Sequence, residues 1–431
     1  MKISVIGMGY VGGTTAACFA ELGHEVWGID HDDKKIEVYN SGKAPFYEKG
    51  LDRLIKHNSA EGRLHFTTNI SEGIKEAQVI ILAVGTPPKE DGSPDLGTIE
   101  KVAQEIGNSL KHYAVIVEKS TVPIRTAEWM CSILGKYLES DKFDVAACPE
   151  FLRESTAVHD FMNPDRIAIG TDSDRAAQVL FELYKPIVAP KIHTSIKAAE
   201  MIKHAVNAAL YMKIAFAFSV SQLCDAEGNV DCVEVLKGVG LDKRIGESFL
   251  QPGPGVGGFC FPKDLDAWIS IHKKYGVYSG LFEAVREINR LQKQHVVNKI
   301  INSFNGDING KKIGVLGLAF KAGTNDMRLA ASIDIIKSLQ SKGAKIIAYD
   351  PKAMEDAKKI FTDVEYAPHS LHVAENSDAL VIMTEWPEFK ELDIKKLREK
   401  IGIIIDTRNM YEPRRMKQLR YVYDCMGRPI K

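Results

Sequence analysis

Residues 3–12 read ISVIGMGYVG, in which a short β-branched run leads directly into glycines spaced as G-x-G-x-x-G. A helical pattern follows, and the next strand-like run, residues 25–29, ends at Asp30. In a dinucleotide-binding fold such glycines permit a tight turn, the helix N-terminus binds pyrophosphate, and the terminal acid accepts hydrogen bonds from ribose hydroxyls. The pattern predicts this fold; the alternative is that the glycines serve only the turn and its packing. Asp30 favours NAD, because a carboxylate would repel the 2′-phosphate of NADP.

The same rhythm of short β-branched runs and helical patterns continues to about residue 195, with further strand-like runs at 79–84, 115–118 and 145–147. A second rhythm of this kind starts at Lys312 and has strand-like runs at 313–316, 344–349, 379–383 and 403–405. Alternation of this type indicates doubly wound parallel sheets. We therefore predict an α/β protein with two Rossmann-like domains.

The segment between the two rhythms is helical in character. Residues 191–227 contain no Gly or Pro and are mostly good helix formers, which predicts one long helix. Residues 228–300 also look helical but are broken by a glycine-rich loop at 251–260. The expected division is 1–195 for an N-terminal dinucleotide-binding domain, 196–300 for the central long helix and a helical middle domain, and 301–431 for a C-terminal Rossmann-like domain.

Length and composition exclude several classes of protein. A chain of 431 residues is too long for one small binding module. Lys and Arg number 56 against 57 Asp and Glu, so the general basic excess that favours nucleic acid is missing. Polar residues interrupt the apolar stretch 205–223, which argues against a membrane-spanning helix. No signal-peptide pattern precedes the glycine motif. Seven cysteines without a CxxC spacing favour reduced thiols. We expect a soluble cytoplasmic protein with no metal site and no nucleic-acid or membrane partner.

One cysteine differs in its surroundings from the others. Residues 253–264 read GPGVGGFCFPKD, which places Cys260 directly after a loop too rich in glycine for a helix or central strand. Glycines let a substrate approach, Lys263 can favour the thiolate, and Asp264 offers a carboxylate within one turn. Cys260 is therefore a candidate nucleophile, with a structural loop thiol as the alternative. Cysteines such as Cys18 and Cys224 lie in apolar helical patterns and are expected to be core residues.

Two polar pairs stand at helical spacing. Lys203 and Asn207 are four residues apart on the predicted long helix and share a face. Glu150 and Glu154 have the same spacing in CPEFLRE at 148–154. Each pair either lies beside a cleft or belongs to an ordinary solvated surface.

Taken together, the motifs resemble the UDP-glucose/GDP-mannose dehydrogenase family over essentially the whole length. The segments that carry the resemblance are GMGYVG at 7–12, KSTVP at 119–123, PEFLRE at 149–154 with PDR at 164–166, the helix bearing Lys203 and Asn207, RIG at 244–246, GGFCFPKD at 257–264 and GLAFKAGTNDMR at 317–328. Several independent motifs in family order favour the catalytic interpretation of Cys260.

The resemblance implies a four-electron oxidation of the C6 hydroxymethyl of a nucleotide sugar to a carboxylate, with two NAD and one water. Lys203 and Asn207 suit the base and the oxyanion stabiliser of the alcohol step. Cys260 would hold the aldehyde as a thiohemiacetal and then as a thioester. Asp264 with Thr121 would position the water, and Glu150 would act as an acid or base.

By the same resemblance, two sets of binding residues carry over. On the NAD side they are Gly7, Gly9, Tyr10, Val11, Gly12, Asp30, Lys35, Thr86, Thr121, Glu154, Lys263 and Arg328. On the nucleotide-sugar side they are Glu150, Phe151, Leu152, Glu154, Lys203, Asn207, Arg244 from a neighbouring subunit, Phe249, Leu250, Gln251, Gly255, Gly257, Lys321 and Arg408. A homodimer through the central helix is expected, because that helix is apolar around most of its circumference.

The chain departs from the family pattern at several places. Phe259 replaces the usual Ser before the cysteine, Phe218-Ser219 replaces an Asn-Glu pair, Cys148 replaces an Asn, and residues 321–331 lack both usual prolines. The segment FPKD resembles the UDP-glucose branch, which makes UDP-glucose the expected substrate and UDP-glucuronate, a polysaccharide precursor, the expected product. GDP-mannose and UDP-N-acetylhexosamines are alternatives. Rival functions are a non-catalytic nucleotide-sugar-binding protein and a two-electron hydroxyacid dehydrogenase.

Overall fold

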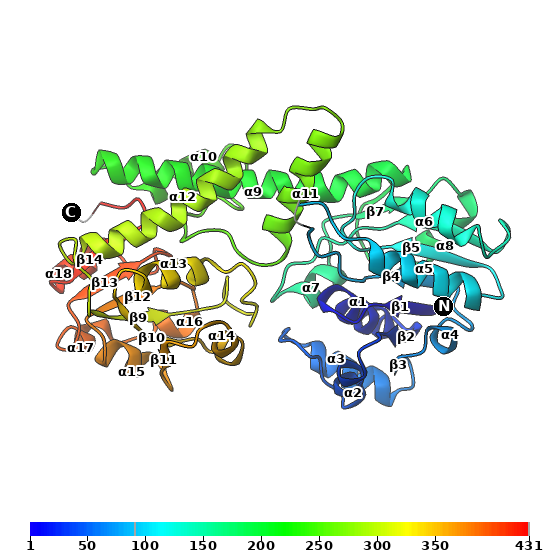
Figure 1. The fold of residues 1–431 in the computed structure, drawn as a ribbon, viewed down its shortest axis with the longest axis horizontal. Coiled ribbons are helices and arrows are strands. Elements are labelled where there is room, and N and C mark those ends of the chain that lie inside the picture. The colour runs from blue at the N-terminus through cyan, green and yellow to red at the C-terminus, as the bar shows by residue number, and fades with distance from the viewer. Residues whose placement is uncertain (90–91, 430–431) are drawn as a thin grey trace. The chain divides into compact units, whose positions relative to one another are not determined.

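The computed structural model describes residues 1–89 and 92–429 and contains two compact units (Figure 1). The first unit comprises Met1–Val206 and Asp266–Gly276, and the second comprises the rest of the chain. Each unit is built around one sheet. This architecture confirms the prediction of two α/β domains with parallel sheets and a long helix between them in the sequence.

The sheet of the first unit has eight strands in the order β3-β2-β1-β4-β5-β6-β7-β8. They are β1 (Lys2–Ile6), β2 (Glu25–Ile29), β3 (Leu64–Thr67), β4 (Val79–Leu82), β5 (Ala114–Glu118), β6 (Phe143–Ala147), β7 (Ile167–Gly170) and β8 (Lys191–Thr194). The helices of this unit up to β8 are α1 (Tyr10–Glu21), α2 (Asp33–Asn40), α3 (Leu51–Ala60), α4 (Ile70–Gly73), α5 (Gly97–Ser109), α6 (Thr126–Leu134), α7 (Ala157–Met162) and α8 (Asp174–Leu183).

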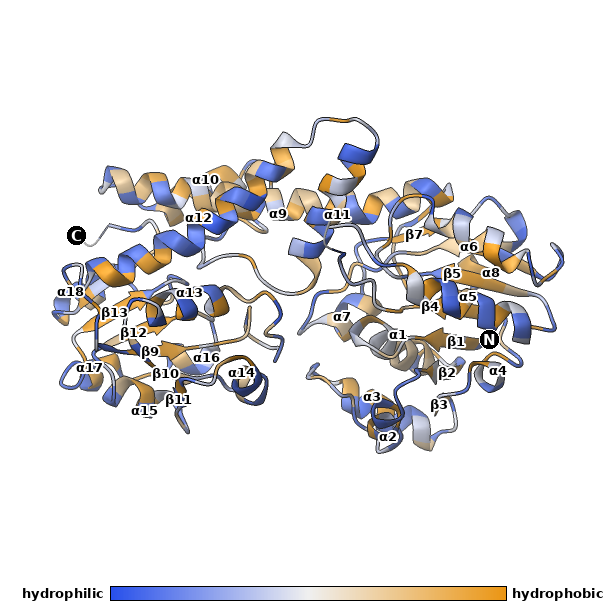
Figure 2. Cartoon of the chain, in the orientation of Figure 1, coloured by the Kyte–Doolittle hydropathy of each residue, from blue (hydrophilic) through white to orange (hydrophobic). Residues whose placement is uncertain are grey.

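Side chains alternate between the two faces of this sheet, so each face has its own core. Ile3 and Val5 of β1 pack in a cluster with residues of α1, α3 and α8, whereas Ile6 packs with residues of α5 and α6. The central strands β4 and β5 are buried and mostly hydrophobic, as expected for a sheet covered on both sides, whereas the edge strand β8 reads KIHT and has no buried residue (Figure 2). One feature was not predicted: β7 runs antiparallel to β6, and β8 then pairs in parallel with β7.

The central helices begin after this sheet. They are α9 (Ile196–Glu227), α10 (Cys232–Gly240), α11 (Cys260–Lys274) and α12 (Gly280–Asn302). The sequence-based start of the long helix at Lys191 was wrong, because residues 191–194 pair with β7 as β8. Ser195 then caps α9, with its Oγ accepting a hydrogen bond from Ala198 N at 3.3 Å. α9 contributes residues to both units, as does α11.

The sheet of the second unit has six parallel strands in the order β11-β10-β9-β12-β13-β14. They are β9 (Lys312–Leu316), β10 (Lys345–Tyr349), β11 (Val364–Tyr366), β12 (Ala379–Ile382), β13 (Ile403–Asp406) and β14 (Val422–Cys425). The accompanying helices are α13 (Ala331–Gln340), α14 (Met354–Ile360), α15 (Ser370–Glu375), α16 (Pro387–Lys390), α17 (Ile394–Leu397) and α18 (Pro413–Gln418). Residues of α12, α13 and α14 pack on one face, and residues of α15 to α18 on the other.

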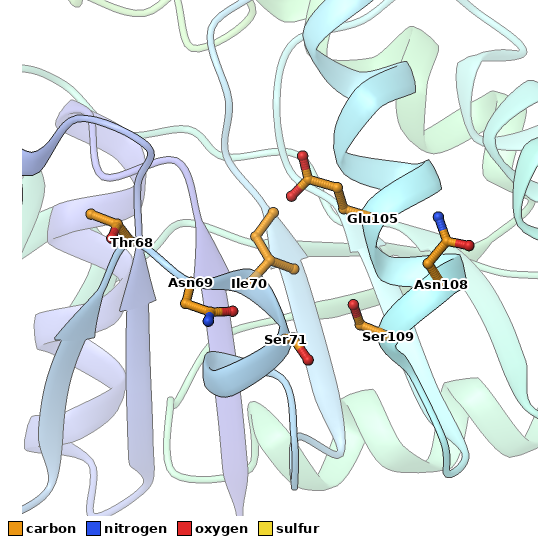
Figure 3. A pocket seen from close by; sticks show the side chains of 7 residues that line it. All are labelled: Thr68, Asn69, Ile70, Ser71, Glu105, Asn108 and Ser109. Carbon is orange, nitrogen blue, oxygen red and sulfur yellow. The ribbon is translucent and has the colours of Figure 1, made fainter.

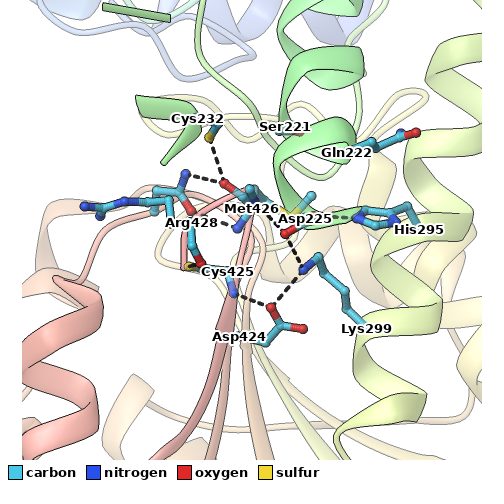
Figure 4. A network of polar contacts seen from close by, with 12 residues as sticks. Ser221, Gln222, Asp225, Cys232, His295, Lys299, Asp424, Cys425, Met426 and Arg428 are labelled. Carbon is cyan, nitrogen blue, oxygen red and sulfur yellow. Dashed lines mark hydrogen bonds and ion pairs between the residues drawn. The ribbon is translucent and has the colours of Figure 1, made fainter. Parts of the chain in front are cut away.

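A charged network holds the second half of α9 to this unit (Figure 4). Asp225 of α9 accepts hydrogen bonds from His295 Nε2 at 2.7 Å and from Lys299 Nζ at 3.0 Å, both on α12. Lys299 also bonds Asp424 of β14 at 2.8 Å, and Asp225 accepts from Gly427 N at 3.0 Å. Three chain segments far apart in sequence are thereby fixed together. Among the described residues, no helix has the length and apolar character needed to cross a membrane.

Candidate active site

The glycine turn between β1 and α1 has the shape that a dinucleotide requires. Gly7 has φ +94°, which favours glycine, and a Cβ on Gly12 would lie 1.8 Å from Gly7 O. A Cβ on Gly9, by contrast, would meet nothing within 4 Å, so the backbone before Tyr10 and Val11 at the start of α1 is open to approach. The turn and the helix N-terminus therefore fit a bound pyrophosphate.

Asp30 follows β2 at the edge beside this turn. It is buried, and its carboxylate accepts from Met8 N at 2.8 Å and pairs with Lys35 Nζ at 2.7 Å. Burial opposes the charge of Asp30, but Lys35 and the backbone N–H groups outweigh burial and hold its pKa below the usual value. A carboxylate kept ionised in this position can accept hydrogen bonds from ribose hydroxyls, so the residues present fit NAD.

Lys203 and Glu150 form a buried ion pair in the first unit. Lys203 Nζ lies 2.8 Å from Glu150 Oε1, and the two residues are 5% and 7% exposed. Glu150 Oε2 also accepts from Leu152 N at 2.5 Å, which holds the start of the PEFLRE segment. The Phe151 ring centroid lies 5.7 Å from Lys203 Nζ. An ordinary solvated surface is therefore the wrong interpretation for both charged residues of this pair.

Two threonines of the predicted site are neighbours in the same unit. Thr86 is buried, and its Oγ1 donates to Thr121 O at 3.0 Å. Thr121 and Lys203 line one small cavity, whose other lining residues are Glu118, Ser120, Val122, Ala147, Pro149 and Glu200. Glu154 is half-buried and lies in the turn before α7. Sequence reasoning missed Glu118 and Glu200, because only the tertiary structure brings these residues to Lys203.

Cys260 begins α11 in the second unit and is exposed. The N-terminus of a helix favours a negative charge, which suits a thiolate. Asp264 lies one turn further along α11 and is buried; Lys263 Nζ is 2.7 Å from its Oδ1, and Asn207 Nδ2 donates to its Oδ2 at 2.6 Å. Asn207 is itself 6% exposed, so it too is no surface residue. The structure thus groups Asn207, Lys263 and Asp264.

The loop that precedes Cys260 is held rigidly within the second unit. Asn289 of α12 accepts from Val256 N at 2.7 Å and donates to Val256 O at 3.2 Å. Gln292 Nε2 donates to Gly253 O at 2.6 Å. Gly258 has φ +83°, and a Cβ on Gly257 would lie 2.7 Å from Leu329 O. The loop therefore needs glycine at these two positions, because a side chain would collide with neighbouring backbone or strain the chain. The earlier part of the loop contains Phe249, which has φ +66°, buried Leu250, exposed Gln251 and Gly255, which has φ +141°.

The predicted cations of the second unit differ in their environments. Arg408 touches the glycine loop, since its Nη1 would lie 3.2 Å from a Cβ on Gly253, and it donates to Met383 O and Phe320 O. Lys321 Nζ lies 5.6 Å from the centroid of the Phe320 ring. Arg244 is exposed and pairs with Asp242 in its own loop. No hydrogen bond or ion pair links Arg244 to another predicted site residue within the described part of the chain.

Phe259 has a contact role that the sequence did not reveal. Its ring centroid lies 4.5 Å from the Arg328 guanidinium carbon and 5.6 Å from Lys263 Nζ. Arg328 also pairs with Asp326 at 2.7 Å. The phenyl ring that replaces the usual Ser is therefore a platform for two cations.

Other features of the described residues do not compete with this site. An open hollow of about 470 Å³ lies between α4 and α5 and is lined by Thr68, Asn69, Ile70, Ser71, Glu105, Asn108 and Ser109 (Figure 3). It contains none of the predicted site residues.

All seven cysteines lie within the described residues, and none forms a disulfide. No group of three or more potential metal-ligating side chains is found in residues 1–89 and 92–429.

Comparison with known proteins identifies the fold and its parts. Three domains of the UDP-glucose/GDP-mannose dehydrogenase family match the chain: the NAD binding domain at residues 1–188, the central domain at 197–291 and the UDP binding domain at 314–413. The chain belongs to the UDP-glucose/GDP-mannose dehydrogenase family. Its membership makes it an NAD-dependent oxidoreductase whose substrate is a nucleotide sugar, as the resemblance of the motifs implied.

Full-length relatives and solved structures of the family agree with this assignment. The UDP-glucose 6-dehydrogenase TuaD of Bacillus subtilis is 44% identical, with 99% of this chain and 93% of the relative covered. A UDP-glucose 6-dehydrogenase of Rhizobium meliloti is 40% identical over 100% of both chains. The structure of a UDP-glucose dehydrogenase from Pyrobaculum islandicum superposes with a TM-score of 0.92 at 35% identity, covering 99% of this chain and 98% of that one.

Proposed function

We propose that this member of the family is a UDP-glucose 6-dehydrogenase, which oxidises the C6 hydroxymethyl of UDP-glucose to the carboxylate of UDP-glucuronate. The observation that carries the proposal is Cys260, exposed at the start of α11, four residues before an Asp264 held by Asn207 and Lys263. A two-electron dehydrogenase has no use for such a thiol. The relatives named UDP-glucose 6-dehydrogenase support the choice of sugar.

The alcohol step needs a base for the hydroxyl proton. Lys203 first passes a proton to its partner Glu150 across 2.8 Å, and the neutral amine then takes the proton from the C6 hydroxyl. Asn207 stabilises the developing oxyanion through its amide. NAD, when bound, accepts the hydride that leaves the sugar carbon in each of the two oxidations.

The aldehyde step needs a nucleophile, because an aldehyde carbon does not give up a hydride directly. The Cys260 thiolate adds to the carbon, a C–S bond forms, and the oxygen takes a proton to give a thiohemiacetal. Loss of the hydride and of that oxygen's proton leaves a thioester. Water, positioned by Asp264 and Thr121, then attacks the carbonyl carbon; the C–S bond breaks, and the carboxylate and the thiol are released.

Binding roles follow the same division. We assign residues 1–195 to NAD, 196–300 to the catalytic loop and dimerisation, and 301–431 to the nucleotide sugar. The residues assigned to NAD are Gly7, Gly9, Tyr10, Val11, Gly12, Asp30, Lys35, Thr86, Thr121, Glu154, Lys263 and Arg328. Those assigned to the nucleotide sugar are Glu150, Phe151, Leu152, Glu154, Lys203, Asn207, Arg244, Phe249, Leu250, Gln251, Gly255, Gly257, Lys321 and Arg408.

We further propose a homodimer in which α9 packs against its counterpart. Met212, Phe216 and Leu223 are exposed, and their spacing places them on one face of α9. Burying such a stripe against a second copy removes apolar surface from water. In this dimer Arg244 serves the neighbouring subunit, which accounts for its exposure here. The cysteines, none of which forms a disulfide, support a cytoplasmic location.

The test is the amount of NADH formed per sugar with UDP-glucose, GDP-mannose and UDP-N-acetylhexosamines. We expect two NADH per UDP-glucose and little turnover of the other sugars. Two NADH from a different sugar would change the substrate but keep the mechanism. One NADH per sugar would indicate a two-electron dehydrogenase, and binding without NADH formation would indicate a non-catalytic protein.

A further inference from the structure

Glu118 is a buried carboxyl group that the proposed mechanism does not use. It is the last residue of β5 and is 2% exposed. Its Oε1 accepts from Ser120 N at 2.7 Å, whereas its Oε2 has no hydrogen-bond partner within the described part of the chain. A buried oxygen of this kind is costly unless something satisfies it. Its unusual state calls for a functional explanation.

The surroundings of Glu118 supply one. Glu118 lines a small cavity together with Ser120, Thr121, Glu200 and Lys203, and the central space fits one water molecule. A water at this place would have polar side chains on several sides, which is the condition for a stable buried water. Lys203 is the proposed base of the alcohol step. The cavity is therefore lined both by Glu118, which has an unsatisfied carboxyl oxygen, and by Lys203, which must pass on a proton after the alcohol step.

The charged groups around the cavity explain the protonation state of Glu118. Burial, together with the nearby Glu200 of α9, raises the pKa of Glu118 to about 8, although the Ser120 backbone N–H opposes this rise. Glu200 is occupied differently, because its two oxygens accept from Arg125 N at 2.6 Å and Ala127 N at 2.9 Å. Lys119 is also buried, and its Nζ donates to Cys148 O at 3.4 Å. A group that titrates near neutral pH is well matched to proton transfer.

We propose that Glu118 is a proton-relay residue, which exchanges protons with Lys203 through a water molecule in this cavity. The inference rests on the proposed role of Lys203. The hydroxyl proton first passes to the Lys203 amine; the ammonium then gives a proton to the water, and the water gives one to the Glu118 carboxylate. Lys203 is restored as a neutral amine, and the proton resides on Glu118 Oε2. Ser120 and Thr121 line the same cavity and are half-buried, and in this proposal the proton leaves to solvent past them.

The experiment compares the pH dependence of kcat in the wild type, E118Q and E118D, with UDP-glucose and NAD. Glutamine keeps the acceptor for Ser120 N but does not titrate. We expect kcat of the wild type to rise with pH through about pH 8 and the rise to disappear in E118Q. The kcat of E118Q should fall about tenfold or more, with KM for both substrates within about twofold of the wild type. E118D should keep a pH-dependent rise.

The matched control is E200Q, which changes a buried carboxyl on the same cavity whose oxygens already have backbone partners. E200Q should lose thermal stability and keep a pH-dependent rise in kcat, with the rise moved to lower pH because the charge of Glu200 no longer raises the pKa of Glu118. If E118Q is poorly folded, infrared spectroscopy of E118D and the wild type must show a buried carboxyl that titrates near neutral pH. An unchanged pH profile in E118Q, or the absence of that carboxyl signal, would overturn the relay. Two NADH per sugar from the wild type would leave the proposed function standing in either case.

Discussion

The backbone N–H of Ser155 donates a hydrogen bond to Tyr10 Oη at 2.9 Å. Tyr10 belongs to the glycine motif of the cofactor turn, and Ser155 follows PEFLRE and has φ +73°. The Tyr10 hydroxyl in turn donates to the buried carboxylate of Glu48. One phenol therefore fixes the segment assigned to the sugar to the segment assigned to NAD, within a single unit.

Replacing Tyr10 by Phe removes only this hydroxyl. We expect Y10F to lose about 1–3 kcal/mol of unfolding free energy, because Glu48 stays buried without its donor. The KM for the nucleotide sugar should rise several-fold, since residues 150–156 lose an anchor. Thermal melting and initial-rate kinetics measure the two effects. Y137F, which changes an exposed tyrosine, is the control; equal KM values for Y10F and Y137F would contradict the anchoring role.

The pair of Lys203 and Glu150 leads to a second prediction. In E150Q the buried Lys203 loses its counter-charge, and breaking a buried pair costs about 3–5 kcal/mol. Denaturant unfolding should show a loss of this size, together with a kcat at least about tenfold lower. E182Q breaks an exposed pair with Lys185 and should cost less than about 1 kcal/mol. A loss in E150Q no larger than that in E182Q would argue against the buried pair.

The covalent step depends on the Cys260 sulfur. C260S should form no measurable sugar acid, because a serine hydroxyl is a far weaker nucleophile than a thiolate. Binding of UDP-glucose and NAD, measured by calorimetry, should persist. C131S alters another exposed cysteine, on α6, and should keep wild-type turnover. Normal acid production by C260S would exclude the thioester route.

The contacts of Phe259 can be tested by two substitutions. F259S removes the ring from Arg328 and Lys263. Cation–π contacts contribute about 0.5–1 kcal/mol at exposed sites such as Arg328, and about 2 kcal/mol at desolvated sites such as the buried Lys263. Because both cations are assigned to NAD, the KM for NAD should rise about two- to tenfold. F259Y keeps an aromatic face and should stay near the wild type. Equal KM values in the two variants would show that the ring is not the platform.

The pH dependence of stability offers a test of Glu118 that does not involve catalysis. Its folded-state pKa is raised from 4.5 to about 8, so the folded state holds a proton that the unfolded chain loses. The free energy of unfolding should therefore fall as pH rises from 4.5 through about 8, by several kcal/mol at about 1.4 kcal/mol per pKa unit. E118Q should lack this fall. Parallel curves of unfolding free energy against pH for the wild type and E118Q would instead indicate that Glu118 is an ordinary, solvated carboxyl.

Local sequence patterns were enough to predict the architecture, because β-branched runs and glycine spacing are properties of short segments of the chain. The run 3–12 with Asp30 predicted the first strand, turn and helix, and the β-branched runs predicted most of the central strands of both sheets. The start of the long helix and the reversal at β7 were missed, since residues 191–194 are compatible with either structure and only pairing with β7 selects the strand. Short outer strands such as β11 carry too few residues for a pattern.

The candidate site shows the same division between local and distant information. The sequence by itself determined the chemical groups: the glycine turn with its acid, the thiol after a glycine loop, and Lys203 and Asn207 at helical spacing. Only the tertiary structure decided the partners: Glu150 for Lys203, Asp264 for Asn207, and Glu118 on a shared cavity. Burial and pairing depend on segments distant in the chain, and these contacts set the charges and pKa values on which the chemistry depends.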